Sequence, residues 1–318
     1  MANQSEVSEF ILIGFPGLPQ KLHHLVSAAM FLFYTTALMA NGTVIILIYF
    51  REHLHQPMYL IISNLSLSDL AFDTVTLPKA IAVYWFGDGR IPLTVCMLQL
   101  FCVHYLGSLD SFIIMLMAVD RYVAICKPLR YSFIITNKLI ALLCYILWLI
   151  AAIFGIGAVA VTSQLSYCYS KINNYFCSSS TILSLTCVDT FSTRRITFTL
   201  AMIVLLIPLS FIIFSYIVII GTISSSRNSQ NWQKAFYTCS THLFIIGMYF
   251  IPRLFVYTAN QLHLIINADL NVLLLGLYSY VPHLVSPIIY CLRTREIKRT
   301  LGNIFKITSG GYSVRFRH

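Results

Sequence analysis

The chain has 318 residues, of which 58% are hydrophobic and only 10% are charged, with a formal net charge of +10. Soluble globular domains carry roughly 25% charged residues, so this composition excludes an ordinary soluble protein. Apolar runs of about 20 residues, long enough to cross a bilayer, recur along the sequence and predict an integral membrane protein.

Seven membrane-spanning helices follow one another in the predicted order. We expect them at residues 24–50, 57–85, 93–126, 138–162, 196–223, 235–260 and 268–291. Short segments of alternating hydrophobicity, typical of a membrane β-barrel, do not occur. The predicted fold class is therefore an all-α membrane protein, with one helix bundle over 24–291 between an N-terminal segment, 1–23, and a tail, 292–318.

Lysine and arginine are distributed unequally between the two sides of the predicted bundle. Fourteen lie on the loops after the first, third and fifth spans, in the tail or at their edge, and six lie on the opposite side. Cytoplasmic segments carry the excess of positive charge, so the tail is expected inside the cell and the N-terminal segment outside. The net charge thus reflects membrane insertion rather than nucleic-acid binding, and the basic tail is suited to contact anionic lipid.

Glycosylation and cysteine patterns agree with this orientation. Asn3 begins an N-glycosylation sequon on the predicted outer side. Four of the nine cysteines fall on or beside outer loops, where disulfides persist. Four cysteines allow three pairings, and their spacing does not choose among them. They are Cys96, Cys168, Cys177 and Cys187.

Ionisable residues inside the predicted spans are functional hypotheses, because each is costly in the bilayer. Asp69 and Asp110 must be protonated, hydrogen-bonded or bound to a cation. Arg253 needs an acid, backbone carbonyls, water or an anionic ligand. His242 and His283 are most simply interpreted as hydrogen-bonded to a neighbouring helix.

Two of the predicted helices carry polar stripes when residues are placed 100° apart around the helix axis. A stripe of this kind faces the interior of a bundle rather than lipid, and Pro252 predicts a kink beside the second stripe. The stripe of the third span contains Leu100, Val103, His104, Gly107, Asp110 and Arg121, and that of the sixth contains His242, Tyr249, Arg253 and Tyr257.

Short motifs occur in a fixed order along nearly the whole chain. They are REHLHQPMY at 51–59, NLSLSDL at 64–70, MAVDRYVAICKPLRY at 117–131, SYIVII at 215–220, KAFYTCSTHL at 234–243 and SPIIYCLRTREIKRTL at 286–301. In this order they resemble the odorant receptors, a family of rhodopsin-like G-protein-coupled receptors. GFPGL at 14–18 and LHQPMYL at 54–60 are most similar to the fish-like class I receptors, which favour water-soluble odorants.

The resemblance implies a seven-helix bundle with a short amphipathic eighth helix in the plasma membrane. It implies that a small external odorant activates a stimulatory, olfactory-type heterotrimeric G protein and raises cyclic AMP. Arg121, partnered by Asp120, would be an inner latch that opens a cleft for the G protein, because a guanidinium can exchange its acid partner for backbone carbonyls. The other residues implied in this switch are Tyr122, Tyr216, His242 and Tyr290.

The resemblance also implies bonds and binding sites within the bundle. The disulfides would be Cys96–Cys177 and Cys168–Cys187. A sodium ion would bind between Asp69 and Asp110, where the family usually has Glu at the second position. The implied odorant pocket comprises Leu100, Val103, His104, Gly107, Ser108, Leu200, Val204, Arg253, Val256, Tyr257, Gln261, Gly276, Ser279 and Tyr280.

The sequence departs from the family pattern at two places. Ser286 precedes Pro287 where the family has Asn, which weakens the expected hydrogen-bond link to Asp69 and bears on the efficiency of activation. Tyr249 and Phe250 reverse the aromatic order that is usual in the sixth span of the class I receptors, so the aromatic switch residue is left open between them.

Other functions fit the sequence less well. A transporter or channel would favour inverted repeats and longer polar stripes. No GxSxG, HExxH or Walker-type motif supports an enzyme. A biogenic-amine receptor would need an acid where the third span has Val103, whereas a non-olfactory receptor of the same fold for another small ligand stays an alternative. Arg253 and His104 favour a small polar or anionic odorant.

Overall fold

The computed structural model describes residues 8–225, 229–262, 264 and 267–293. Within these residues seven helices are long and apolar enough to cross a membrane, which confirms the predicted seven-helix bundle. The glycosylation expected at Asn3 and the amphipathic eighth helix expected in the tail lie outside the described residues. The seven helices are α1 (His23–Phe50), α2 (Pro57–Phe86), α3 (Leu93–Cys126), α5 (Asn137–Thr162), α7 (Phe191–Ser225), α8 (Ser229–Gln261) and α9 (Ala268–Arg293).

The helix bounds follow the predicted spans closely except at two N-terminal ends. α7 begins at Phe191 rather than near 196, and α8 begins at Ser229 rather than near 235. Hydropathy locates the part of a helix that lies in the membrane. It does not detect polar helical turns that extend beyond the membrane. At the start of α7, the backbone N–H and Nε of Arg194 bond to the carbonyl and hydroxyl of Thr190 at 2.8 and 2.9 Å and hold such a turn.

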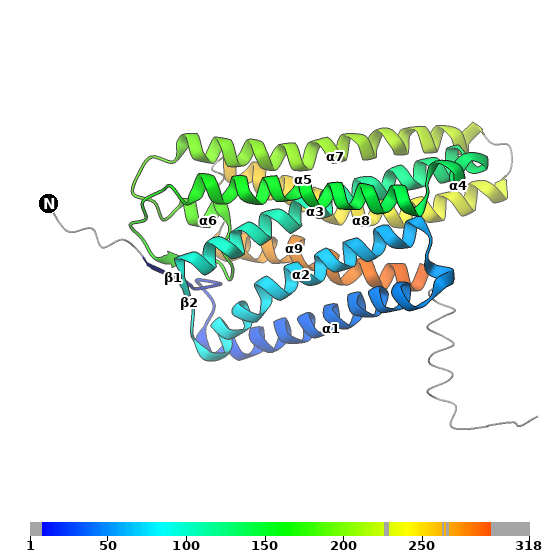
Figure 1. The fold of residues 1–318 in the computed structure, drawn as a ribbon. Helices are drawn as coiled ribbons and strands as arrows, with labels where there is room; N and C mark the ends of the chain where they lie inside the picture. The colour runs from blue at the N-terminus through cyan, green and yellow to red at the C-terminus, as the bar shows by residue number, and fades with distance from the viewer. Residues whose placement is uncertain (1–7, 226–228, 263, 265–266, 294–318) are drawn as a thin grey trace, which may run out of the picture.

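Helix α3 occupies the centre of the bundle. It contacts α2, α5, α7 and α8, whereas α1 packs against α2 and α9. Figure 1 shows the long helices side by side, with β1 (Glu9–Leu12), β2 (Arg90–Pro92) and α6 (Ser179–Leu183) at one end and α4 (Tyr131–Ile134) at the other. The remaining short elements are η1 (Gln20–Leu22), η2 (Glu52–Leu54), η3 (Pro128–Arg130) and β3 (Lys171–Ile172).

Side chains are distributed as a bilayer requires. Leu32 and Phe214 expose 64% and 65% of their surface on the outside of the bundle, where lipid rather than water is the solvent. Asp69, Asp110 and His283 are at most 3% exposed in its interior. Polar groups in a membrane must find partners within the protein, so the buried polar residues, rather than the apolar ones, mark the interior.

A small sheet and two disulfides hold the predicted outer end together. β1 pairs antiparallel with β2 and parallel with β3, in the order β2-β1-β3. The bond Cys96–Cys177 ties the start of α3 to the loop before α6, and Cys168–Cys187 joins the chain before α6 to the chain after it. These are the two pairings that the resemblance implies, and their Cα atoms lie 5.6 and 5.2 Å apart, within the usual range.

Candidate functional site

A cavity opens between the helices in the half of the bundle that carries the small sheet. Side chains from α2, α3, α5, α6, α7, α8 and α9 line it. Apolar groups make up most of its wall, with a few polar groups converging on it, as in most sites for small ligands. Most of the predicted pocket residues lie here, namely Val103, His104, Gly107, Ser108, Leu200, Val204, Arg253, Tyr257, Gln261 and Ser279.

Four predicted pocket residues lie away from this cavity. Leu100 is fully buried among Phe10 and other residues under the small sheet. Val256, 1% exposed, packs into the main core between helices. Gly276 lies directly against the hydroxyl of Tyr175, and Tyr280 stacks on the same ring at a centroid distance of 6.1 Å. The side chain of Tyr175, from the loop before α6, therefore lies against Gly276 and Tyr280, which the resemblance placed in the odorant pocket.

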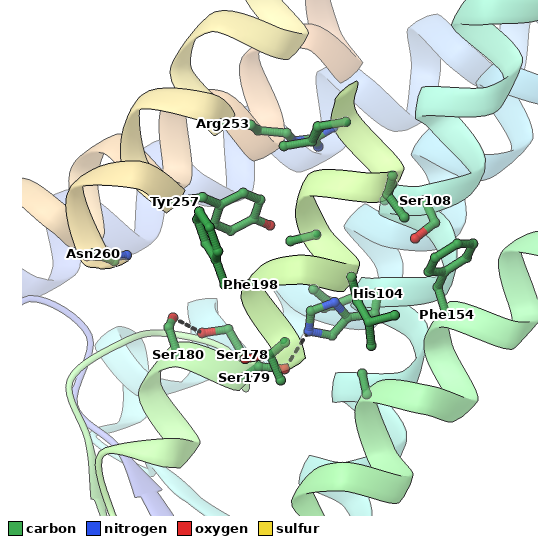
Figure 2. Close-up of a pocket in the computed structure, with 18 of the residues that line it drawn as sticks. His104, Ser108, Phe154, Ser178, Ser179, Ser180, Phe198, Arg253, Tyr257 and Asn260 are labelled. Atoms are coloured by element: carbon green, nitrogen blue, oxygen red, sulfur yellow. Dashed lines mark hydrogen bonds between the residues drawn. The ribbon is translucent and has the colours of Figure 1, made fainter. Parts of the chain in front are cut away.

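Three serines at the start of α6 border the cavity and were missed from the sequence. They are Ser178, Ser179 and Ser180. The Ser179 hydroxyl lies 2.7 Å from Nε2 of His104 on α3, and Figure 2 shows this contact at the edge of the cavity. Helical periodicity cannot place a loop. The implied bond Cys96–Cys177 could have done so, because it brings the serines that follow Cys177 to α3.

Arg253 supplies a buried positive charge to the cavity wall. It is 5% exposed, and its guanidinium carbon lies 3.5 Å from the ring centre of Tyr249 and 5.5 Å from that of Tyr278. Among the described residues it forms no ion pair, and its Nη1 has no hydrogen-bond partner. Ring faces attract a cation without neutralising it, so the guanidinium keeps the capacity to bind an anionic or strongly polar group.

Tyr249 connects Arg253 to α3. Its hydroxyl donates to the Gly107 carbonyl at 2.5 Å and accepts from Ser111 at 3.2 Å. Tyr249 lines the cavity, whereas the adjacent Phe250 packs into an apolar cluster with residues of α3 and α7. Of the two aromatic residues that the sequence left open, Tyr249 is thus the one placed between the cavity and α3.

A cluster of ionisable side chains lies in the middle of the bundle. Asp69 and Asp73 come from α2, Asp110 from α3 and His283 from α9. Nδ1 of His283 lies 2.8 Å from Asp73, and its Nε2 lies 3.5 Å from Asp69 and 3.8 Å from Asp110. His283 was expected only to bond a neighbouring helix, so its place among three carboxylates was missed. The charge of the carboxylates fits a cation, and the imidazole adds a nitrogen to the oxygen ligands expected for sodium.

The predicted switch residues lie at the opposite end of the bundle from the small sheet. Nε of Arg121 lies 4.0 Å from Asp120, and the guanidinium also reaches the sulfur of Met58 on α2. The other oxygen of Asp120 accepts a 2.8 Å hydrogen bond from Tyr131 of α4. Burial and the adjacent Asp120 raise the pKa of Tyr131 above its usual range, so the hydroxyl stays a donor.

Further predicted switch residues link α7 to α8 and α9 to α3. Tyr216 of α7 and Nδ1 of His242 of α8 lie 2.5 Å apart, so His242 bonds a neighbouring helix. The Tyr290 hydroxyl of α9 points at the sulfur of Met117, 3.6 Å away on α3. Tyr122 packs at the margin of the core near this end, and Ser286 is buried within α9.

Known proteins resemble the chain along almost its whole length. A family model described as olfactory receptor matches residues 30–307. Olfactory receptor 1496 and olfactory receptor-like protein I9, both from Rattus norvegicus, are 33% and 36% identical over 95% of this chain and 96% of their own lengths. Olfactory receptor 6B1 from Homo sapiens is 34% identical over 95% of the chain and 96% of its own length.

Proposed function

This chain belongs to the olfactory receptor family, and we propose that it binds a small polar or anionic odorant and activates a stimulatory heterotrimeric G protein, raising cyclic AMP. Olfactory receptors are multi-pass plasma-membrane proteins that sense small molecules, couple to G proteins and are not enzymes. The observation that carries the ligand class is Arg253, a buried guanidinium in the cavity wall without an acid partner among the described residues.

The cavity offers two polar anchors for one small ligand. Figure 2 shows Arg253 and Tyr257 on one side of the space and His104 with Ser179 on another. A carboxylate at Arg253 gains a charge-assisted hydrogen bond, which is roughly twice as strong as a neutral one. The imidazole of His104 or the hydroxyl of Ser179 would bind a second polar group, and the apolar walls would enclose a short carbon chain.

Activation is proposed to follow from contacts made in only one of two bundle states. A ligand shifts such an equilibrium only by its difference in affinity for the two states. An anion at Arg253 would draw the guanidinium off the Tyr249 ring, and Tyr249 bonds Gly107 on α3. Because α3 also carries Asp120 and Arg121, and α8 carries His242, this contact supports coupling between the cavity and the inner end.

A cation between Asp69 and Asp110 belongs to the same proposal. Both carboxylates are buried, and buried charges are stable only when they are paired or bound to a metal. The resemblance implies sodium, whereas the nitrogen of His283 beside the two carboxylates favours a divalent ion. Such an ion would hold α2 and α3 together in the resting state.

Cyclic AMP measurements in cells test this proposal. The chain is expressed with and without an olfactory-type stimulatory G protein α-subunit, and surface expression is checked. We expect short carboxylates to raise cyclic AMP only in cells that contain the G protein, with weaker responses to neutral analogues of equal size. Responses to neutral analogues alone would contradict the anionic ligand class, and responses without the G protein would contradict the coupling.

A further inference from the structure

The mid-bundle cluster has the geometry of a metal site with a nitrogen ligand. His283 holds its two ring nitrogens in different environments. Nδ1 is 2.8 Å from an oxygen of Asp73, whereas Nε2 has no hydrogen-bond partner within the described part of the chain and is buried. Nε2 points between Asp69 and Asp110, at 3.5 and 3.8 Å.

This arrangement matches how proteins prepare a histidine for a metal ion. A metal-binding imidazole almost always donates its other N–H to a carboxylate or carbonyl, which fixes the tautomer and the ring orientation. Here an oxygen of Asp73 lies 2.8 Å from Nδ1 and can accept its N–H, and with that tautomer the lone pair of Nε2 would face the two remaining carboxylates. Backbone contacts support the position of the ring, because Asn41 of α1 donates a 2.8 Å hydrogen bond to the His283 carbonyl.

The donor spacing distinguishes between classes of ion. Zinc bonds nitrogen and carboxylate oxygen at about 2.0–2.2 Å, so tetrahedral geometry separates its ligands by about 3.4 Å. The distances of 3.5 and 3.8 Å from Nε2 are close to this value, and the three donors lie within 4.8 Å of one another. Imidazole suits zinc, iron and nickel, whereas hard cations prefer a shell of several oxygens.

Charge balance also favours a divalent ion. The cluster brings three carboxylates into a bundle where uncompensated charge is costly. With His283 neutral, one dication and the buried guanidinium of Arg253 together balance three ionised carboxylates, whereas one sodium ion in place of the dication leaves a negative charge.

We propose that Asp69, Asp110 and Nε2 of His283 bind a divalent transition-metal ion of the zinc class in preference to sodium, with Asp73 as a positioning residue. The bound ion would join α2, α3 and α9 at the centre of the bundle. The alternative is that His283 carries a proton and is itself the cation of the cluster, in which case no metal binds. The site needs neither odorant nor G protein, so its test is independent of the receptor assay.

Metal content and thermal stability of the purified full-length chain in lipid nanodiscs test the site. After treatment with a chelator, the chain is titrated with zinc chloride, or with sodium chloride at constant ionic strength. We expect about one retained zinc per chain and an unfolding midpoint that rises by several degrees at saturation, because a ligand of the folded state stabilises it. Sodium should not reproduce this shift.

Four variants locate the metal. His283→Gln and Asp110→Asn should each abolish retained zinc and the shift, and either one is sufficient if the other fails to fold. Asp73→Asn should weaken zinc binding about 10- to 100-fold without abolishing it, as loss of a ligand-orienting carboxylate does. His24→Gln, which removes an exposed histidine, is the matched control and should bind as the unmodified chain does.

Three results would overturn the inference. Folded chain that retains no zinc and shows no shift would assign the cation to protonated His283. A zinc shift that persists in both His283→Gln and Asp110→Asn would place the metal elsewhere. If sodium raises the unfolding midpoint and zinc does not displace the sodium ion, the site binds the monovalent ion instead.

Discussion

At the residue scale, individual hydrogen bonds determine which polar groups in the cavity wall are paired with protein atoms and which are free. The bond between His104 and Ser179 joins α3 to α6 at 2.7 Å. Arg253, by contrast, lies on an aromatic ring and keeps an unpaired N–H among the described residues. The first arrangement joins α3 to α6 at the edge of the cavity, and the second leaves a guanidinium that, in the proposed function, binds the ligand.

Replacing Ser179 tests the first arrangement. We expect Ser179→Ala to raise the half-maximal agonist concentration about two- to tenfold, because a buried hydrogen bond contributes roughly 0.5–1.5 kcal/mol. Cyclic AMP dose–response curves measure the change. Ser184→Ala, an exposed serine that follows α6, is the control and should leave the curve in place. Equal curves for Ser179→Ala and the unmodified chain would contradict the role of this contact.

Tyr131 tests the inner latch. Its hydroxyl bonds Asp120 from α4, so Tyr131→Phe should loosen the resting state and raise odorant-independent cyclic AMP by up to about tenfold. Tyr145→Phe, an exposed tyrosine on α5, should have no effect. Unchanged basal cyclic AMP in Tyr131→Phe at equal surface expression would show that the bond does not restrain activation.

The raised pKa of Tyr131 determines how this bond depends on pH. A folded-state pKa above the usual value of about 10 means that the stabilising hydroxyl is fully protonated below that value and is lost only at higher pH. The difference in basal cyclic AMP between Tyr131→Phe and the unmodified chain should therefore stay constant from about pH 6 to pH 9. A difference that disappears within this range would contradict the assignment.

At the element scale, the turns and strands at the end of the bundle that carries the small sheet position the cavity. Gly14 follows β1 at a φ of 75°, and an added methyl group would meet the Tyr84 hydroxyl. That hydroxyl accepts a 2.8 Å hydrogen bond from the backbone of Phe15. The N-terminal segment thus depends on a glycine for its path across α2.

Gly14→Ala is expected to lower the unfolding midpoint of the purified chain. A left-handed conformation costs an alanine about 1–2 kcal/mol, and the clash with Tyr84 adds to this cost. Gly87→Ala is the matched control, because Gly87 has a φ of 70° but open space around it. Equal midpoints for the two variants would show that the contact with Tyr84 adds nothing.

Helical periodicity and hydropathy predicted the long elements but not the short ones. The seven spans were found because each repeats one signal over about 20 residues. The strand Glu9–Leu12 was missed because it is short and its partners, β2 and β3, are distant in sequence and shorter still. The same reason applies to Ser179, whose contact with His104 depends on a loop path that no local pattern encodes.

The mid-bundle cluster likewise contains residues that the sequence identifies and contacts that only the packing of the helices determines. Asp69 and Asp110 were recognised from their presence inside predicted spans. Their relation to His283 depends on how α9 is rotated against α2 and α3, and this follows from packing rather than from the residues of α9 alone. Asp73 could have been included, since it lies one helical turn from Asp69 on the same face.

We propose the orientation of the whole molecule from the distribution of charge along its sequence. Lysine and arginine are in excess in the sequence segments predicted to lie inside the cell, and the cavity lies toward the end of the bundle that carries the small sheet. An epitope tag at the N-terminus should therefore be detected on intact cells, and one at the C-terminus only after permeabilisation. Detection of the C-terminal tag on intact cells would contradict the proposed orientation and the access of odorants to the cavity.

The measurement that tests the central claim most directly is the cyclic AMP response to a carboxylate and its methyl ester in Arg253 variants. We predict that Arg253→Ala weakens the carboxylate response about 10- to 100-fold, as expected for a hydrogen bond to a charged group, and removes the preference over the ester. Arg253→Lys should recover part of that preference. Arg195→Ala, an exposed arginine on α7, should change neither response. An unchanged carboxylate response in Arg253→Ala at equal surface expression would contradict the account.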